Sequence, residues 1–340
     1  MQQKSVYIAY TGGTLGMQRG PRGYRPEPGF LARQMDEMPV LRHPGMPRYV
    51  VHEYDPLLDS SNMTPRDWVK LADDIYSKYD EYDGFIVLHG TDTMAYSAAA
   101  LSFMFNSLDK PIVFTGSQIP LVELRNDARE NLITSLLIAA GGEVPEVCLF
   151  VGSRLLRGNR STKTSAAHFR AFRSPNYPPL GDAGVELVIH HERLQPWPER
   201  PLTYARVGGA EVADIRFFPG MTPRVLEQFL APPLQGAVLH TYGLGNAPDD
   251  PSILRPIRDA CDRGVVIVNC TQCLEGSVNM TGYATGNALA DAGVASGFDM
   301  TPEASLTKLY WLLSLELGAA EVRRQMGIDL RGEITPVSRA

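Results

Sequence analysis

Short apolar runs alternate with longer amphipathic stretches over the first half of the chain. The apolar runs have the length and the unbroken hydrophobicity of strands that are buried on both faces of a parallel sheet. Strands are expected at residues 5–10, 48–54, 84–88, 111–115 and 146–151, and helices at residues 64–78, 93–107 and 125–140. This alternation predicts an α/β fold with a doubly wound, mainly parallel sheet, and we assign the larger N-terminal domain to residues 1–190.

The same alternation returns on a smaller scale after a proline-rich stretch. Residues 191–212 combine prolines with charged neighbours, which is typical of a linker between domains. A smaller C-terminal α/β domain is expected over residues 213–340, and its final residues 331–340 are expected to be loosely held. Its strands are predicted at residues 213–217, 235–240 and 265–268, and its helices at residues 222–230, 249–262 and 302–316.

Two segments rich in threonine and glycine directly follow predicted strands. They are Thr11-Gly12-Gly13-Thr14 and His89-Gly90-Thr91-Asp92-Thr93. The ligand crevice of an open α/β sheet lies beyond the carboxyl ends of its strands, so two threonine hydroxyls and a carboxylate are expected in one pocket. A hydroxyl that attacks carbon needs a general base and nearby oxyanion donors, and glycine allows backbone N–H groups to approach closely.

Each of these segments alone has a plainer interpretation, as a tight turn or as a helix cap with an acidic first turn. Their occurrence together at strand ends favours a site. A phosphate-binding loop does not fit, because Gly12-Gly13-Thr14-Leu15-Gly16 lacks the first glycine of a dinucleotide fingerprint and no Gly-Lys-Ser/Thr follows it.

Other polar segments follow the remaining predicted strands. They are Asp59-Ser60-Ser61, Thr115-Gly116-Ser117-Gln118 and residues 157–164, which include Lys163. By composition, residues 157–164 are an exposed basic loop. Alternatively, Lys163 lies near Thr91 and Asp92, where it takes a hydroxyl proton or stabilises an alkoxide. Residues 18–24 are polar and rich in glycine, and we interpret them as a loop or hairpin that forms a lid.

Composition narrows the choice of partner. The net charge is −6 and the basic residues are scattered, which argues against a nucleic-acid partner and favours a small-molecule substrate. No apolar run reaches the length of a membrane helix or a signal-peptide core, so we expect a cytoplasmic protein that does not bind membranes. The pair Cys270 and Cys273 has no second pair to complete a zinc site, and we interpret the four cysteines as small buried thiols.

Taken together and in order, five motifs resemble those of the bacterial-type L-asparaginases. They are Thr11–Thr14, His89–Thr93, Thr115–Gln118, Gly158–Lys163 and Tyr242-Gly243-Leu244-Gly245-Asn246. The run Asp59-Ser60-Ser61 is most similar to the cytoplasmic type I branch. The resemblance implies a two-domain asparaginase-like fold that hydrolyses L-asparagine to L-aspartate and ammonia, with no metal and no organic cofactor.

The resemblance also implies roles for individual residues. Thr14 would be the nucleophile that forms a covalent acyl-enzyme, assisted by Tyr24, and the catalytic set would be completed by Thr91, Asp92 and Lys163. Substrate would be bound by Asp59, Ser60, Thr91, Asp92, Ser117 and, from a neighbouring subunit, Asn246. The active form would then be a homodimer or a dimer of dimers. From the residues alone either threonine hydroxyl could attack, and selectivity between asparagine and glutamine stays open.

Some type I enzymes are activated by asparagine at a second site, which corresponds here to Thr162, His240 and Cys273. Histidine stands at position 240 where arginine is expected, so this regulation is in doubt. Two other classes of function are compatible with the fold. One is an amidotransferase subunit that acts on a tRNA-bound acyl group, and the other is a silent amino-acid sensor. The presence of both threonines, Asp92 and Lys163 favours the hydrolase.

Overall fold

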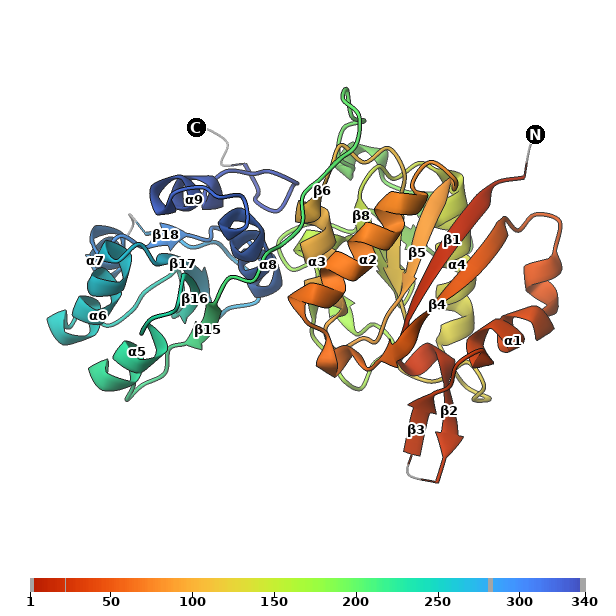
Figure 1. Ribbon diagram of the computed structural model, residues 1–340, viewed down its shortest axis with the longest axis horizontal. Helices are drawn as coiled ribbons and strands as arrows, with labels where there is room; N and C mark the ends of the chain where they lie inside the picture. The colour runs from red at the N-terminus through yellow and green to blue at the C-terminus, as the bar shows by residue number, and fades with distance from the viewer. Residues whose placement is uncertain (1–2, 22, 281–283, 337–340) are drawn as a thin grey trace. The chain divides into compact units, whose positions relative to one another are not determined.

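The computed structural model describes residues 3–21, 23–280 and 284–336 of the chain (Figure 1). These residues form two compact units. Unit 1 comprises residues 1–174 and 178–204, and unit 2 comprises residues 175–177 and 205–340. The division at Tyr204 falls inside the segment 191–212 that the sequence predicts as a linker. Among the described residues, no helix is both long and apolar enough to cross a membrane.

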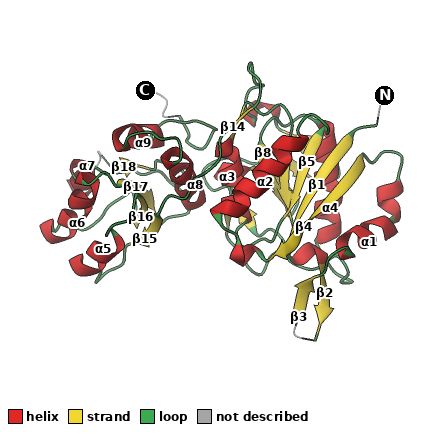
Figure 2. Ribbon diagram, in the orientation of Figure 1, coloured by secondary structure: helices red, strands yellow, loops and turns green. Residues whose placement is uncertain are grey.

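Unit 1 is built on an eight-stranded sheet with the order β13-β12-β9-β8-β7-β5-β1-β4. Its parallel strands are β4 (Arg48–Leu58), β1 (Ser5–Gly12), β5 (Gly84–Leu88), β7 (Ile112–Thr115) and β8 (Val147–Val151). Every residue of β5, β7 and β8 is buried, as expected for strands covered on both faces. Helices α2 (Pro65–Lys78) and α3 (Met94–Met104) lie in front of the sheet and α4 (Ala128–Gly141) lies behind it (Figures 1 and 2).

The sheet is mixed beyond β8, because β9 (Arg154–Arg157), β12 (Gly181–Ala183) and β13 (Leu187–Ile189) run antiparallel. The reversal between β8 and β9 uses only Gly152 and Ser153, whose φ angles are 63° and 69°. Positive φ at both central residues is typical of a two-residue hairpin turn. These added strands are short and partly polar, so the hydrophobic pattern did not predict them.

Several smaller elements complete unit 1. They are η1 (Thr14–Gly16), β2 (Met17–Gly20), β3 (Gly23–Pro26), α1 (Phe30–Glu37), η2 (Pro39–Arg42), η3 (Ser60–Asn62), β6 (Phe105–Asn106), η4 (Gly158–Arg160), β10 (Thr162–Lys163), β11 (Phe172–Arg173), η5 (His191–Arg193) and β14 (Thr203–Tyr204). Strands β2 and β3 form an antiparallel hairpin, which is one of the two predicted forms of residues 18–24. The helix predicted to reach residue 107 ends at Met104, because Phe105 and Asn106 pair with β14.

Unit 2 contains a four-stranded parallel sheet in the order β15-β16-β17-β18. Its strands are β15 (Val212–Arg216), β16 (Gly236–Thr241), β17 (Val266–Thr271) and β18 (Ala295–Ser296), and its helices are α5 (Pro223–Phe229), α6 (Pro251–Asp262), α7 (Ala284–Asp291), α8 (Pro302–Leu313) and α9 (Ala319–Met326). The core between them includes Phe217, Leu226, Ile257 and Ile267. All three strands and all three helices predicted for this part of the chain are present, within three residues at each end.

The prediction of a loosely held C-terminal segment is wrong for residues 331–336. Glu333 is fully buried and forms an ion pair of 2.5 Å with Lys308, which is also fully buried. Lys308 donates in addition to the Ile328 carbonyl at 2.6 Å, and the Thr335 amide donates to Asp299 at 2.9 Å. A buried pair of opposite charges costs less than one unpaired charge, so the segment is fixed by polar contacts that hydropathy does not reveal. Residues 337–340 lie outside the described residues.

Candidate active site

Three turns meet at the carboxyl ends of neighbouring parallel strands in unit 1. A Cβ atom added to Gly13, after β1, would lie 2.4 Å from the amide nitrogen of Gly90, after β5. A Cβ added to Gly90 would lie 2.4 Å from the hydroxyl oxygen of Ser60, in the turn after β4. Only glycine allows this approach. The turns that carry Thr14, Ser60 and Thr91 are therefore packed against one another.

Thr14 opens the short helix η1 directly after Gly13, whose φ of 90° favours glycine. The next residue, Leu15, is buried and anchors the turn, and its carbonyl accepts from the Leu121 amide at 3.1 Å. Thr14 itself is half-buried. Within residues 3–21, 23–280 and 284–336, its hydroxyl has no hydrogen-bond partner. The turn thus holds a hydroxyl in place without using its proton or its lone pairs.

Lys163 joins the second threonine to the carboxylate. Its ammonium lies 2.9 Å from the Thr91 hydroxyl oxygen and 2.6 Å from Asp92 Oδ1. An ammonium can only donate, so the Thr91 oxygen accepts from Lys163 and the Thr91 proton goes to Gln118 Oε1, at 3.1 Å. The Lys163 side chain is 19% exposed and that of Asp92 is 64% exposed, which leaves the carboxylate accessible to a cationic ligand.

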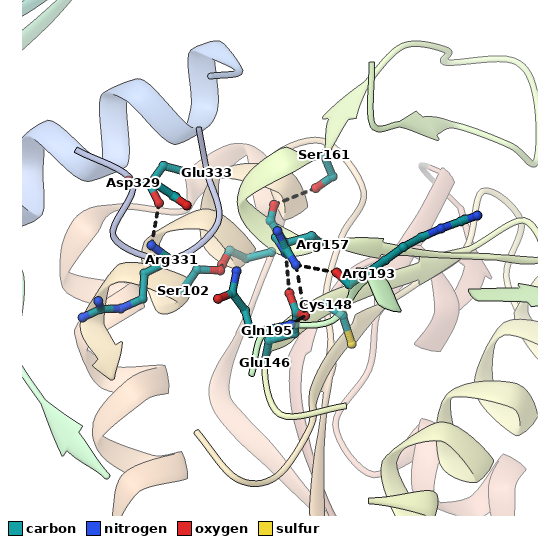
Figure 3. Close-up of polar contacts among 12 residues, drawn as sticks. Ser102, Glu146, Cys148, Arg157, Ser161, Arg193, Gln195, Asp329, Arg331 and Glu333 are labelled. Carbon is teal, nitrogen blue, oxygen red and sulfur yellow. Dashed lines mark hydrogen bonds and ion pairs between the residues drawn. The ribbon is translucent and has the colours of Figure 1, made fainter. Parts of the chain in front are cut away.

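The segment that leads to Lys163 is buried, so its interpretation as an exposed basic loop is wrong. Arg157 is 4% exposed and its Nε donates to Glu146 at 2.6 Å, while its second terminal nitrogen donates to the Arg193 carbonyl at 2.8 Å (Figure 3). Arg160 is 2% exposed. Composition counts charges but not their partners, and a paired arginine can be buried. Lys163 itself is on β10, which pairs with β11.

Gln118 is a site residue that sequence reasoning missed in favour of its neighbour. The Ser117 hydroxyl donates to the Ile119 carbonyl at 2.8 Å, so it can meet a substrate only as an acceptor. The Gln118 side chain accepts from Thr91 instead. Asp127 organises this turn by accepting from the amides of Gln118 at 3.0 Å and Ile119 at 3.1 Å. The sequence signal that could have identified Gln118 was its position after β7, at the carboxyl end of a parallel strand.

Asp59 and Ser60 lie at the start of η3. Asp59 is exposed and caps the turn, because its carboxylate accepts from the Ser61 amide at 3.1 Å. Ser60 is 3% exposed, and its carbonyl accepts from the Thr93 hydroxyl at 2.7 Å. The turn after β4 is therefore tied to the helix cap that follows Thr91 and Asp92.

Tyr24 lies on strand β3 of the hairpin. Its side chain is 44% exposed and its hydroxyl donates to Glu123 Oε1 at 2.5 Å. This hydrogen bond raises the pKa of Tyr24 above its ordinary value, so the phenol keeps its proton. Its oxygen still has lone pairs with which to accept a hydrogen bond from another group. Glu123 was not predicted, because no sequence pattern links it to residue 24.

The remaining predicted residues are divided between the units. Thr162 is buried next to Lys163 in unit 1, and His240, Asn246 and Cys273 belong to unit 2, so their part in a common site stays a prediction. The ring of His240 is in close contact with the Asp214 carboxylate.

The cysteines are all free, but Cys273 is exposed, which corrects its interpretation as a buried thiol. Cys270 is buried because it lies inside β17, whereas Cys273 lies beyond the end of that strand. Among the described residues, no group of three or more His, Cys, Asp or Glu side chains could hold a metal ion.

Comparisons with known proteins show the family to which the chain belongs. The asparaginase N-terminal model matches residues 5–195, and the glutaminase/asparaginase C-terminal domain model matches residues 211–326. L-asparaginase 1 of Escherichia coli strain K12 is 52% identical over 336 residues, which cover 99% of each chain. The human 60 kDa lysophospholipase is 42% identical over 358 residues, which cover 99% of this chain and 62% of that protein.

Solved structures give the same result. The crystal structure of L-asparaginase I from Vibrio cholerae superposes with a TM-score of 0.92 and 49% identity, over 98% of this chain and 100% of that one. The match therefore extends over both units. The chain belongs to the asparaginase family, in its type I L-asparaginase branch.

Proposed function

We propose that this protein hydrolyses the side-chain amide of L-asparagine to L-aspartate and ammonia, with Thr14 as the nucleophile. The observation that carries the proposal is the packing of two turns. One holds a threonine hydroxyl without a hydrogen-bond partner among the described residues. The other holds a threonine that is hydrogen-bonded to a lysine, and this lysine is paired with an accessible carboxylate. This set supplies a nucleophile, a proton-transfer group and an anchor for a cationic substrate without a cofactor.

The reaction takes two steps. In the first, Thr14 Oγ1 bonds to the amide carbon, the hydroxyl proton passes to an acceptor, and ammonia leaves with one added proton, so that an aspartyl ester remains. In the second, water adds to the ester carbon, and aspartate and the free threonine are released. Tyr24 can take the Thr14 proton only as its own proton passes along the hydrogen bond to Glu123, so the Glu123 carboxylate is the final acceptor. Thr91 and Lys163 are proposed to activate the water, with Lys163 as the neutral amine, so that the water proton passes by way of Thr91 to the Lys163 nitrogen; this division of labour rests on the resemblance.

Substrate orientation follows from charge. Asp92 would hold the substrate ammonium, since its carboxylate is accessible and acidic. Ser60 and Asp59 would fix the α-carboxylate and α-amino end, with Ser117 as a further acceptor. Each assignment places a fixed group opposite a complementary atom of a zwitterion, which lowers the entropic cost of the attack.

We further propose that the active form is at least a homodimer located in the cytoplasm. Asn246 would complete the site of a neighbouring subunit. Activation by a second asparagine near Thr162, His240 and Cys273 is not favoured, because Asp214 already occupies a ring nitrogen of His240 and would repel a carboxylate.

The direct test is to mix the purified protein with L-asparagine and measure ammonia and aspartate. The proposal predicts equimolar release that persists in the presence of a chelator. L-glutamine in a parallel assay measures selectivity. Binding of L-asparagine without ammonia release would support a sensor instead. Ammonia release only in the presence of an aminoacyl-tRNA would support an amidotransferase subunit, a class to which a 32% identical relative from Methanobrevibacter smithii belongs by name.

A further inference from the structure

Three buried polar side chains form a chain of hydrogen bonds behind the Thr91 turn. Trp68 comes from α2, Ser97 from α3, and His89 from the end of β5. Their exposed fractions are 6%, 0% and 2%. Polar groups this deeply buried are costly unless each is paired, and here each is paired with the next.

The chemistry of the groups fixes the direction of these bonds. The indole N–H of Trp68 can only donate, and it donates to Ser97 Oγ at 3.0 Å. The Ser97 hydroxyl then has one proton to give, and His89 Nε2 lies 2.9 Å away. At the other end, His89 Nδ1 lies 2.7 Å from the Gly90 carbonyl, which can only accept. His89 must therefore carry its proton on Nδ1, and Nε2 must accept from Ser97.

Burial keeps the imidazole neutral, as this arrangement requires. Desolvation lowers the pKa of His89 to about 4, against an ordinary value of 6.5. A neutral histidine has one donor and one acceptor, and the chain uses both. The tautomer is thus specified from two sides, by the carbonyl at Nδ1 and by the serine at Nε2.

The bond from His89 acts on the peptide group between Gly90 and Thr91. In a trans peptide the C=O and N–H point in opposite directions, so holding the Gly90 carbonyl toward His89 aims the Thr91 N–H away from it. In the described part of the chain, that N–H has no acceptor. Gly90 is also the residue against which the Gly13 and Ser60 turns pack. A rotation of this peptide would disturb all three turns.

We infer that Trp68, Ser97 and His89 form a positioning relay that locks His89 in its Nδ1–H tautomer and thereby holds the Gly90–Thr91 peptide in its catalytic orientation. All three are buried, so they are proposed to act through this peptide and not on the substrate. The inference rests on the proposed function, in that Thr91 is taken to act in turnover. The relay would fix the backbone of Thr91. Lys163 and Gln118 do not do this, because both contact only the Thr91 side chain.

The first experiment compares two serine-to-alanine variants of the same helix. Ser97→Ala breaks the relay. Ser102→Ala is the matched control, because Ser102 is also buried in α3 but donates only to the Ala98 carbonyl, at 2.8 Å. A displaced catalytic group costs between about tenfold and a hundredfold in rate. Ser97→Ala is expected to lower kcat by at least about tenfold with KM changed less than threefold, while Ser102→Ala keeps the wild-type kcat. Equal kcat values in two folded variants would overturn the inference.

A second experiment reads the tautomer directly and needs no turnover. In ¹⁵N-histidine NMR the protonated and unprotonated ring nitrogens resonate far apart, and His89→Asn identifies the signal. Wild-type His89 is expected to show Nδ1–H at pH 7 and no titration down to pH 5. An Nε2–H tautomer, or titration between pH 6 and 7, would overturn the relay even if the protein releases ammonia. Absence of ammonia release from a protein with the expected tautomer would instead contradict the proposed function.

Discussion

The backbone of Gly13 lies against the backbone of Gly90, so closely that a Cβ on Gly13 would stand 2.4 Å from the Gly90 nitrogen. These glycines directly precede Thr14 and Thr91. The contact brings together two turns that carry threonines at the ends of adjacent parallel strands, although Thr14 and Thr91 are 77 positions apart in sequence. The sheet order that places β1 beside β5 is therefore what assembles the proposed catalytic set.

Gly90→Ala should damage the site while leaving the fold intact. The added methyl would lie 2.4 Å from Ser60 Oγ and 2.7 Å from Ser60 Cβ, so the Ser60 turn must shift. Because Ser60 is proposed to bind the α-carboxylate end, we expect KM to rise by about tenfold or more and kcat to fall. Gly209→Ala, at an exposed glycine with no atom within 4 Å of the added Cβ, is the control that should leave both constants unchanged. Steady-state kinetics with L-asparagine measure the difference.

Thr91 and Lys163 should behave as one unit. Thr91→Val and Lys163→Met are each expected to cost roughly a hundredfold or more in kcat, because each removes one side of the 2.9 Å contact. The double variant should cost little more than either single variant. A double-mutant cycle on kcat measures the coupling. Losses that multiply would show that the two residues act independently.

The buried His89 should make stability depend on pH. Its pKa is about 4 in the folded protein against 6.5 when exposed, so the unfolded chain binds more protons between these values. Its contribution is fully present above pH 6.5 and is lost as the pH falls toward 4. At 1.36 kcal/mol per unit, the difference of about 2.5 units amounts to about 3 kcal/mol. Urea unfolding should show a smaller pH dependence in His89→Asn than in wild type. His43→Asn, at an exposed histidine, should keep the wild-type dependence.

Strands that are fully buried were predicted from the sequence more accurately than strands that are partly exposed. Strand β5 was predicted to the residue, because a fully buried strand is uniformly apolar. Strands β12 and β13 were missed, because each has only three residues and neither is fully buried, so they lack that signature. The segment before Lys163 was assigned to the surface on the strength of its arginines, yet Arg157 is buried by its pairing with Glu146, which no periodicity encodes.

For the candidate site, the residues in local sequence motifs could be predicted, and the residues that depend on tertiary contacts could not. Motifs that combine glycine with threonine at strand ends could be predicted, since glycine there has a backbone reason. Side chains that act through a neighbour could not. Gln118 reaches Thr91 across 27 positions, and Trp68 reaches Ser97 across 29. These contacts depend on how α2, α3 and the loops pack, which a single sequence does not display.

Saturation with L-asparagine should be hyperbolic both at pH 8 and at pH 6. An anion site at His240 would need an uncompensated positive charge, but the ring is in contact with the Asp214 carboxylate, whose negative charge repels an anion. Initial rates against substrate concentration test this directly. Sigmoidal curves at either pH would mean that a second asparagine site operates without His240. The substitution Asp214→Asn removes the competing carboxylate, so sigmoidal curves are expected in this variant if His240 binds a second asparagine.

The most direct test of the catalytic role of Thr14 is to trap the acyl-enzyme. Wild type and Lys163→Met are mixed with L-asparagine, quenched in acid, digested and analysed by mass spectrometry. The mechanism predicts an aspartyl ester on the peptide that contains Thr14, in larger amount in Lys163→Met because water attack is slowed, and no ester and no ammonia from Thr14→Ala. An ester on the Thr91 peptide, or ammonia release by Thr14→Ala, would contradict it.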